Sequence, residues 1–472
     1  MGSTPDIGTR VVAGPRLKYV GLTLVLAWHY CLWFVPNSFP DTFLLDDRLT
    51  FAWLVALGST VITVLVLALW MGRKRHLPRN PVVLWAVAAG GATATIALTM
   101  FSAQHPGVAY TSGAVIGFSA GVLWILWGEQ YARQRAAFTM PRISLTYGLT
   151  LLVGLGLASF LPQPLGTVLV SLLPLGSAAL LWLSWRKSSA DRFPPVLPKT
   201  TARKGFISIL TVCGICLIAA LVSYFTVAIV DWDDLWWGAG ESFTYGVAIG
   251  ALFVIAIGFL QYLYPSRSIV FRLFPWLLFF SIIACLLYVL GSQFSFLAFL
   301  LALAVSSVFE VLLIVYMANL TLRGYTSSAT SFALSALSTR LGIFCGNGLA
   351  LTYEHIPGLS AKWTVPTFLF FTAVLAGLII CLIRQEYAIQ DLVRSPENLS
   401  DLATMVAQIA EDFQLSEREQ EIVTFLGRGY TATAIAEKLV ISPHTVNTHV
   451  QHIYDKLGIH KRSDLLDYLN KR

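Results

Sequence analysis

The chain has 472 residues, of which 56% are hydrophobic and only 12% are charged. Because soluble globular proteins carry about 25% charged residues, this composition and a mean hydropathy of +0.70 exclude a purely soluble protein. The net charge of +7 arises in the apolar part of the chain, so it reflects membrane topology rather than nucleic-acid binding.

The apolar part, residues 1–383, repeats the signal of a membrane-spanning helix. Such a helix needs about 20 apolar residues, and about twelve runs meet that length criterion. The first half contains Leu17–Val35, Thr50–Met71, Pro81–Phe101, Ala109–Trp127, Ile143–Leu161 and Leu165–Trp185. The second half contains Phe206–Val230, Phe243–Leu263, Phe274–Leu290, Ser295–Leu320, Ser331–Thr352 and Pro366–Ile383. These runs predict an all-α, twelve-helix transmembrane bundle with six spans in each half.

The loops predict how this bundle is oriented. Cytoplasmic loops retain Lys and Arg, and here the basic residues collect in the N-terminal tail and in every second loop. Examples are Arg10, Arg73, Arg133, Arg186, Arg267 and Arg323. The intervening loops collect acidic residues, including Asp46, Asp233 and Glu241. We therefore expect a multi-pass protein of the bacterial cytoplasmic membrane, in contact with membrane lipid, with both termini in the cytoplasm.

Six spans, a long basic loop and six further spans resemble the major facilitator fold of secondary transporters. The resemblance covers about four-fifths of the chain. Members of that family usually carry a motif after the second span, and Gly72, Arg73 and Lys74 match it. Leu69 stands where the family has an Asp, and this departure argues against a working proton-coupled transport gate.

Two charged residues lie within predicted spans of the second half. An ionisable group in a membrane is costly, so it usually pairs with another group or lines a cavity. Glu310 and Arg340 are therefore predicted to form either a buried ion pair with one another or a polar wall of a ligand cavity.

Small residues recur at helical spacing inside several spans. Gly113, Gly117 and Gly121 repeat every fourth position and predict close packing between helices, with dimerisation as the alternative. Cys213 and Cys216 form a C-x-x-C pattern, which we interpret as two small residues on one helix face rather than a redox or metal site. We expect no metal site, no cofactor and no enzymatic activity, because the sequence contains no phosphate loop, metal cluster or nucleophile constellation.

The composition changes after Ile383, and residues 384–413 are predicted to form a linker. Its first part is polar. Apolar residues then recur at helical spacing: Leu399, Leu402, Met405, Val406, Ile409 and Phe413. This amphipathic helix is expected to pack either on the last domain or on a second copy of the chain.

Residues 414–472 predict a domain of four short helices. Ser416 and Glu419 form a capping box at the start of the first helix. Ser442 caps the third helix, Pro443 takes its first position, and Gly458 ends it. Only Val440 and Ile441 join the second helix to this cap, which is typical of a helix-turn-helix.

The third helix is the predicted recognition helix, which would lie in the major groove of double-stranded DNA. Its unburied face carries the candidate base contacts His444, Asn447, Thr448 and Gln451. Asn and Gln can form paired hydrogen bonds with the major-groove edge of adenine. Three further residues are candidates for phosphate contacts, namely Thr445, Lys456 and Arg462.

This segment resembles the DNA-binding domain of the LuxR/FixJ-type regulators. The residues that carry the resemblance are Leu415–Val423, Gly429, Ile435–Ala436, Leu439, Ile441–Ser442, Thr445–Val446, His449–Val450, Ile453, Lys456–Gly458 and Arg462. The resemblance implies DNA binding as a homodimer that pairs through the fourth helix, where Leu465 and Leu469 lie. The family often has Lys at the position of Asn447, which implies an altered target sequence. The alternative is a four-helix interaction module that does not touch DNA.

Together the two parts resemble LuxR-type proteins with a permease-like N-terminal half. The leading hypothesis is a membrane-embedded one-component transcription regulator, in which an unknown small molecule binds between the two six-helix halves. The alternative is a major-facilitator-like transporter with a regulatory DNA-binding tail.

Overall fold

A computed structural model describes most of the chain. The described residues are 17–35, 47–71, 77–102, 105–133, 140–187, 199–230, 239–263, 269–322, 326–393, 406–407, 409–427, 430, 432–461 and 464–465. The chain divides into two compact units, Met1–Val393 and Arg394–Arg472, and each is treated by itself.

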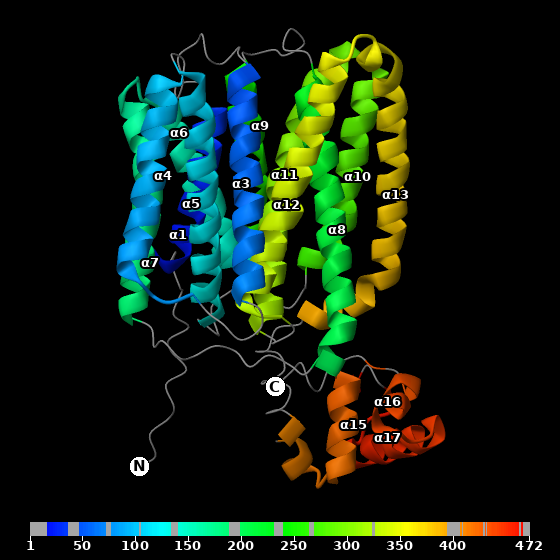
Figure 1. Ribbon diagram of the computed structural model, residues 1–472. Helices are drawn as coiled ribbons and strands as arrows, with labels where there is room; N and C mark the ends of the chain where they lie inside the picture. The colour runs from blue at the N-terminus through cyan, green and yellow to red at the C-terminus, as the bar shows by residue number, and fades with distance from the viewer. Residues whose placement is uncertain are drawn as a thin grey trace. The chain divides into compact units, whose positions relative to one another are not determined.

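The first unit is a bundle of long helices, and each predicted span corresponds to one of them (Figure 1). The first half consists of α1 (Leu17–Phe34), α3 (Asp47–Met71), α4 (Pro81–Phe101), α5 (Pro106–Arg133), α6 (Met140–Phe160) and α7 (Leu165–Lys187). The second half consists of α8 (Lys199–Ile229), α9 (Ala239–Leu263), α10 (Ile269–Leu290), α11 (Ser295–Leu322), α12 (Ser328–His355) and α13 (Leu359–Val393). A short 3-10 turn, Ser292–Phe294, precedes α11.

Ten of these helices, within the described part of the chain, are long and apolar enough to cross a membrane. The two exceptions have different causes. The apolar part of α1 is short, Val20–Phe34, whereas α12 contains many polar residues that face the protein interior, including Ser331, Ser335, Arg340 and Asn347. The polar residues of α12 therefore contact other helices of the bundle and not lipid.

The two halves meet along two lateral seams, one between α3 and α12 and one between α6 and α9. In Figure 1, α3 and α12 lie in the middle of the bundle, between the group of α4, α5 and α7 and the group of α8, α10 and α13. This arrangement places α1, α3, α8 and α12 around the centre, where the pocket described below is found.

Glycines allow the closest helix approaches inside the first half. A Cβ atom on Gly117 of α5 would overlap the Ala56 carbonyl of α3, and one on Gly113 would stand 2.5 Å from the Ala52 carbonyl oxygen. The hydroxyl of Thr60 also donates to the Gly117 carbonyl at 3.0 Å. The repeat therefore packs α5 on α3 within one chain, as expected.

The helix α13 continues beyond the apolar run that ends at Ile383 and extends to Val393. The polar composition that predicted a connector from Arg384 onward does not stop the helix, because this stretch contains no Pro or Gly. The predicted amphipathic helix is described only from residue 406. There Val406, Ile409 and Ala410 are buried in the core of the second unit, so this stripe packs on that unit.

The second unit is built from α15 (Glu417–Gly427), α16 (Ala432–Leu439) and α17 (Pro443–Leu457). Its core consists of the apolar faces of these helices, and its fully buried members include Ile422, Val423, Ile435, Val446 and Ile453. Of the fourth predicted helix, only Asp464 and Leu465 lie within the described residues, and both are helical.

The predicted helix ends of this unit are confirmed. The Glu419 carboxylate accepts from the Ser416 N–H at 2.8 Å and the Glu419 N–H donates to the Ser416 hydroxyl at 3.3 Å, which is the reciprocal capping box. The Ser442 hydroxyl accepts from the Thr445 N–H ahead of Pro443, and Gly458 ends α17 with a φ of 66°. The two caps fix where the recognition helix begins and ends.

Candidate functional site

The recognition helix α17 presents its polar side chains to solvent. All four predicted base-contacting residues are exposed: His444, Asn447, Thr448 and Gln451. The opposite side of the helix is buried through Val446, Ile453 and Leu457. The sequence pattern therefore separates one face that packs from one face that is free to enter a groove.

The turn between α16 and α17 is held from the first helix of the unit. The Arg418 guanidinium donates to the Leu439 carbonyl at 3.0 Å, where α16 ends, and also pairs with Glu421 at 2.7 Å. Val440 follows with a positive φ of 55° and a side chain that is 89% exposed. Arg418 thus satisfies a terminal carbonyl of α16 and fixes the angle at which the recognition helix leaves the turn.

Lys456, predicted to contact phosphate, is engaged inside the unit. Its ammonium group lies 2.7 Å from the Glu419 carboxylate and 3.1 Å from the Gln414 carbonyl oxygen. The Glu419 side chain is only 6% exposed. Lys456 therefore ties α17 to the start of α15, and a phosphate would have to share this ammonium group with Glu419.

The remaining residues that were predicted to act in this unit belong to the dimer contact and to the phosphate contacts. Leu465, expected at or near a dimer contact, is buried in the core of the unit. Its position near a contact between two copies of the chain stays a prediction. Arg462 and Leu469 lie outside the described residues. Thr445 is exposed, and its hydroxyl lies 2.8 Å from the Ser442 hydroxyl at the helix cap.

The contacts of Glu419 predict a dependence on pH. Burial raises the pKa of its carboxyl group, but hydrogen bonds from Lys456 and Ser416 outweigh this effect and hold the pKa below its ordinary value of 4.5. A depressed pKa contributes stability above the unfolded value, and this contribution is lost as the pH falls through the folded value. Amide hydrogen exchange in α15 and α17 of the full-length protein should therefore accelerate several-fold more below pH 4.5 than in Glu419→Gln measured alongside, where this contribution is absent. Equal acceleration in both proteins would contradict the assignment.

In the membrane unit, the structure brings Glu310 and Arg340 together. The Arg340 Nη1 atom lies 2.7 Å from Glu310 Oε1, and the side chains are 10% and 4% exposed, respectively. The Tyr30 hydroxyl of α1 donates to the other carboxylate oxygen at 2.9 Å. This network joins α11 and α12 of the second half to α1 of the first half.

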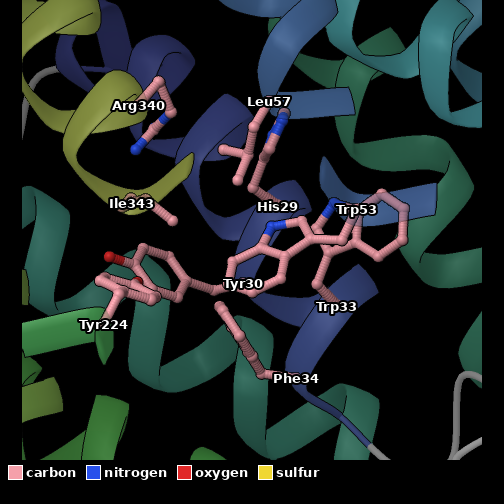
Figure 2. Close-up of a pocket in the computed structure, with 9 residues that line it drawn as sticks. All are labelled: His29, Tyr30, Trp33, Phe34, Trp53, Leu57, Tyr224, Arg340 and Ile343. Carbon is pink, nitrogen blue, oxygen red and sulfur yellow. The ribbon is translucent and has the colours of Figure 1, made fainter. Parts of the chain in front are cut away.

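A pocket lies beside this network (Figure 2). Its volume is about 20 Å³. It is lined from both halves of the bundle, by His29, Tyr30, Trp33, Phe34, Trp53 and Leu57 of the first half and by Tyr224, Arg340 and Ile343 of the second. Figure 2 shows Arg340 reaching in from α12, with the aromatic side chains of α1 and α3 opposite.

Aromatic and polar contacts join the first half of the bundle to the second half at two places. Toward the end of α1, Phe34 stacks on Phe243 with ring centroids 5.0 Å apart, and Thr244 donates to the Phe34 carbonyl at 3.2 Å. Near the start of α12, the Trp124 indole donates to the Phe332 carbonyl at 2.9 Å. The two halves therefore contact each other near the end of α1 and near the start of α12.

The sequence analysis identified Arg340 and Glu310 but missed most of the pocket. Trp33, Trp53 and Tyr224 come from three helices, and in the sequence they look like ordinary aromatic residues of apolar spans. His29, which is half-buried in the structure, was the one further signal, since a His inside a membrane span is costly.

The fold and the two sites define a multi-pass membrane bundle of the major-facilitator type joined to a helix-turn-helix domain. The bundle resembles solved transporters. One is titled "Crystal structure of auto inhibited POT family peptide transporter", with a TM-score of 0.53 and 12% identity over 78% of this chain and 95% of that chain. Another is the POT family transporter PepTSo, with a TM-score of 0.51 and 13% identity over 80% of this chain and 99% of that one. At such identities the likeness shows the fold alone.

The C-terminal part of the chain is similar to a known family. Residues 413–469 match the family model "Bacterial regulatory proteins, luxR family". A similar relative is the oxygen regulatory protein NreC of Staphylococcus aureus, which is 43% identical over 58 residues. That stretch is 12% of this chain and 27% of the relative. The chain thus spans about a quarter of the length of the curated relatives it matches, through its LuxR-type DNA-binding domain.

Proposed function

We propose that the protein is a membrane-embedded one-component transcription regulator. The LuxR-type domain binds double-stranded DNA, and the membrane bundle supplies the input. The observation that supports this most strongly is the exposed recognition face of α17 on a capped helix within a luxR-family domain. His444, Asn447, Thr448 and Gln451 read the bases, and Thr445, Lys456 and Arg462 contact phosphate.

We further propose that a small molecule sensed by the bundle controls DNA binding. The pocket is lined from both halves, so a ligand there would favour one of their relative arrangements over another. Residues 384–413 would pass this change to the DNA-binding domain and alter its pairing as a homodimer. The positive-inside pattern supports this proposal, because it favours both termini in the cytoplasm of a bacterial cell, on the side of the membrane where DNA is found.

The proposal is tested by genome-wide DNA occupancy of the tagged full-length protein in its own cells. Each bidentate side-chain contact to a base is worth about 1–3 kcal/mol, so Asn447→Ala with Gln451→Ala should lower specific affinity by about 30-fold or more. We expect discrete peaks that disappear in this double variant. They should persist in Glu437→Ala, which changes an exposed residue of α16.

The alternative of a transporter with a regulatory tail predicts a different result. If no peaks appear under varied growth conditions, although the protein is present in the membrane, the regulator proposal fails. Uptake of solutes into vesicles would then be the measurement that decides for transport.

A further inference from the structure

The charges beside the pocket cancel one another. Arg340 is paired with Glu310 at 2.7 Å, and the second carboxylate oxygen of Glu310 accepts from Tyr30. Both oxygens are therefore engaged, and the pair as a whole is neutral. An anionic ligand would have to take Arg340 from Glu310 and leave a carboxylate buried without its counter-ion, which is strongly unfavourable. A cationic ligand would meet the Arg340 guanidinium in the pocket wall.

One wall of the pocket offers a hydrogen-bond donor that nothing in the described part of the chain accepts. The indole nitrogen of Trp33 is buried without a partner, and the residue is only 8% exposed. Buried polar groups are rarely left without a hydrogen bond, so each such case needs an explanation. Figure 2 shows Trp33 among the residues that line the pocket, below His29 in this view.

The same pocket offers an acceptor. The Nδ1 atom of His29 lies 3.1 Å from the Val25 carbonyl oxygen. A carbonyl oxygen can only accept, so Nδ1 carries the proton and donates. In the neutral imidazole the other nitrogen, Nε2, is then an acceptor. His29 and Trp33 lie on the same helix four residues apart, so the donor and the acceptor lie on one face of α1.

The rest of the wall is mostly aromatic and leaves little space, although Trp53 also carries an N–H group and Tyr224 a hydroxyl group. Phe34, Trp53, Leu57 and Tyr224 surround the polar groups. A cavity of about 20 Å³ has room for about one water molecule, so a larger ligand must move the two halves apart. A ligand that fits here needs an apolar body as well as polar atoms.

We propose that this pocket binds an uncharged molecule that carries a hydrogen-bond acceptor for Trp33, a donor for His29 and an apolar body that packs between the aromatic walls. Glu310 and Tyr30 act as positioning residues, because they hold Arg340 neutralised and at the edge of the pocket. The inference rests on the proposed sensing role of the bundle and names the chemical class that it senses.

Three probes of matched shape test the charge selectivity: benzamide, benzoate and benzylamine. Binding of each radiolabelled probe to the full-length protein in lipid nanodiscs is measured by equilibrium dialysis at neutral pH. We expect saturable binding of benzamide, at least tenfold weaker binding of benzoate and of benzylamine, and loss of benzamide affinity by about tenfold in Trp33→Phe, which keeps the ring and removes the donor. The control Trp276→Phe, on an exposed face of α10, should bind benzamide as the unaltered protein does.

Three results would overturn the inference: no saturable binding of benzamide, benzoate binding as tightly as benzamide, or unchanged benzamide binding in Trp33→Phe. These results are separable from a failure of the proposed function. DNA peaks that depend on Asn447 and Gln451, without probe binding, reject the pocket and keep the regulator. Probe binding without DNA peaks keeps the pocket and rejects the regulator.

Discussion

Replacing Arg340 with methionine is expected to lower the free energy of unfolding of the membrane unit by about 3–5 kcal/mol, because it leaves Glu310 buried without its counter-ion. The pair is 2.7 Å apart and both side chains are at least nine-tenths buried. Water therefore cannot replace the lost partner. The measurement is an SDS unfolding titration of the solubilised protein, followed by tryptophan fluorescence.

The double variant Arg340→Met, Glu310→Leu provides the matched control. Replacing a whole buried pair with apolar side chains of similar volume is often neutral or stabilising. The double variant should therefore recover at least half of the loss, although Tyr30 loses its acceptor. If Arg340→Met unfolds at the same SDS concentration as the unaltered protein, the ion pair with Glu310 does not contribute to the free energy of unfolding, and the prediction is wrong.

The second large effect is expected for Gly117→Ala, which should lower the free energy of unfolding by about 3 kcal/mol. The new methyl group would overlap the Ala56 carbonyl, and this atom belongs to the α3 backbone and cannot rotate away. Relief requires α3 and α5 to separate, which also stretches the hydrogen bond from Thr60 to the Gly117 carbonyl. The same SDS titration measures the loss.

A glycine without close neighbours provides a control that distinguishes the effect of steric overlap from the effect of helix propensity. A Cβ atom on Gly156 of α6 would meet no atom within 4 Å. Alanine is the better helix former at an unconstrained site by about 1 kcal/mol, so Gly156→Ala should be neutral or stabilising. A comparable loss in both variants would show that contact with α3 is not the cause.

Most of the fold could be predicted because it depends on local signals. Hydrophobic length alone located the membrane helices, and in the case of Pro81–Phe101 both ends agree with the observed helix. The helix-turn-helix followed from caps that act within a few residues, as at Ser442 and Gly458. Such features need no knowledge of which segments meet in space.

The sites were harder to predict from the sequence, because their residues contact partners that are distant along the chain. The Tyr30 hydroxyl bonds to a carboxylate 280 positions away in the sequence, and nothing local to Tyr30 distinguishes it from the other aromatic residues of α1. Lys456 was assigned to phosphate from its place on the recognition helix, whereas its ammonium group meets Glu419 across the unit. Leu465 was placed in the fourth helix from its apolar spacing, but its burial in the core of the unit depends on helices that precede it in the chain.

The position of the buried ion pair on consecutive helices bears on how the protein enters the membrane during synthesis. A charged residue at the centre of a helix raises the cost of insertion by about 2.5–3.5 kcal/mol, and α12 is not apolar enough to satisfy the criterion that ten other helices meet. Glu310 on α11 is made before Arg340 on α12, and the two helices pack against each other. A hairpin of the two can therefore leave the translocon with its charges already matched, so that α11 acts as the insertion partner of its successor.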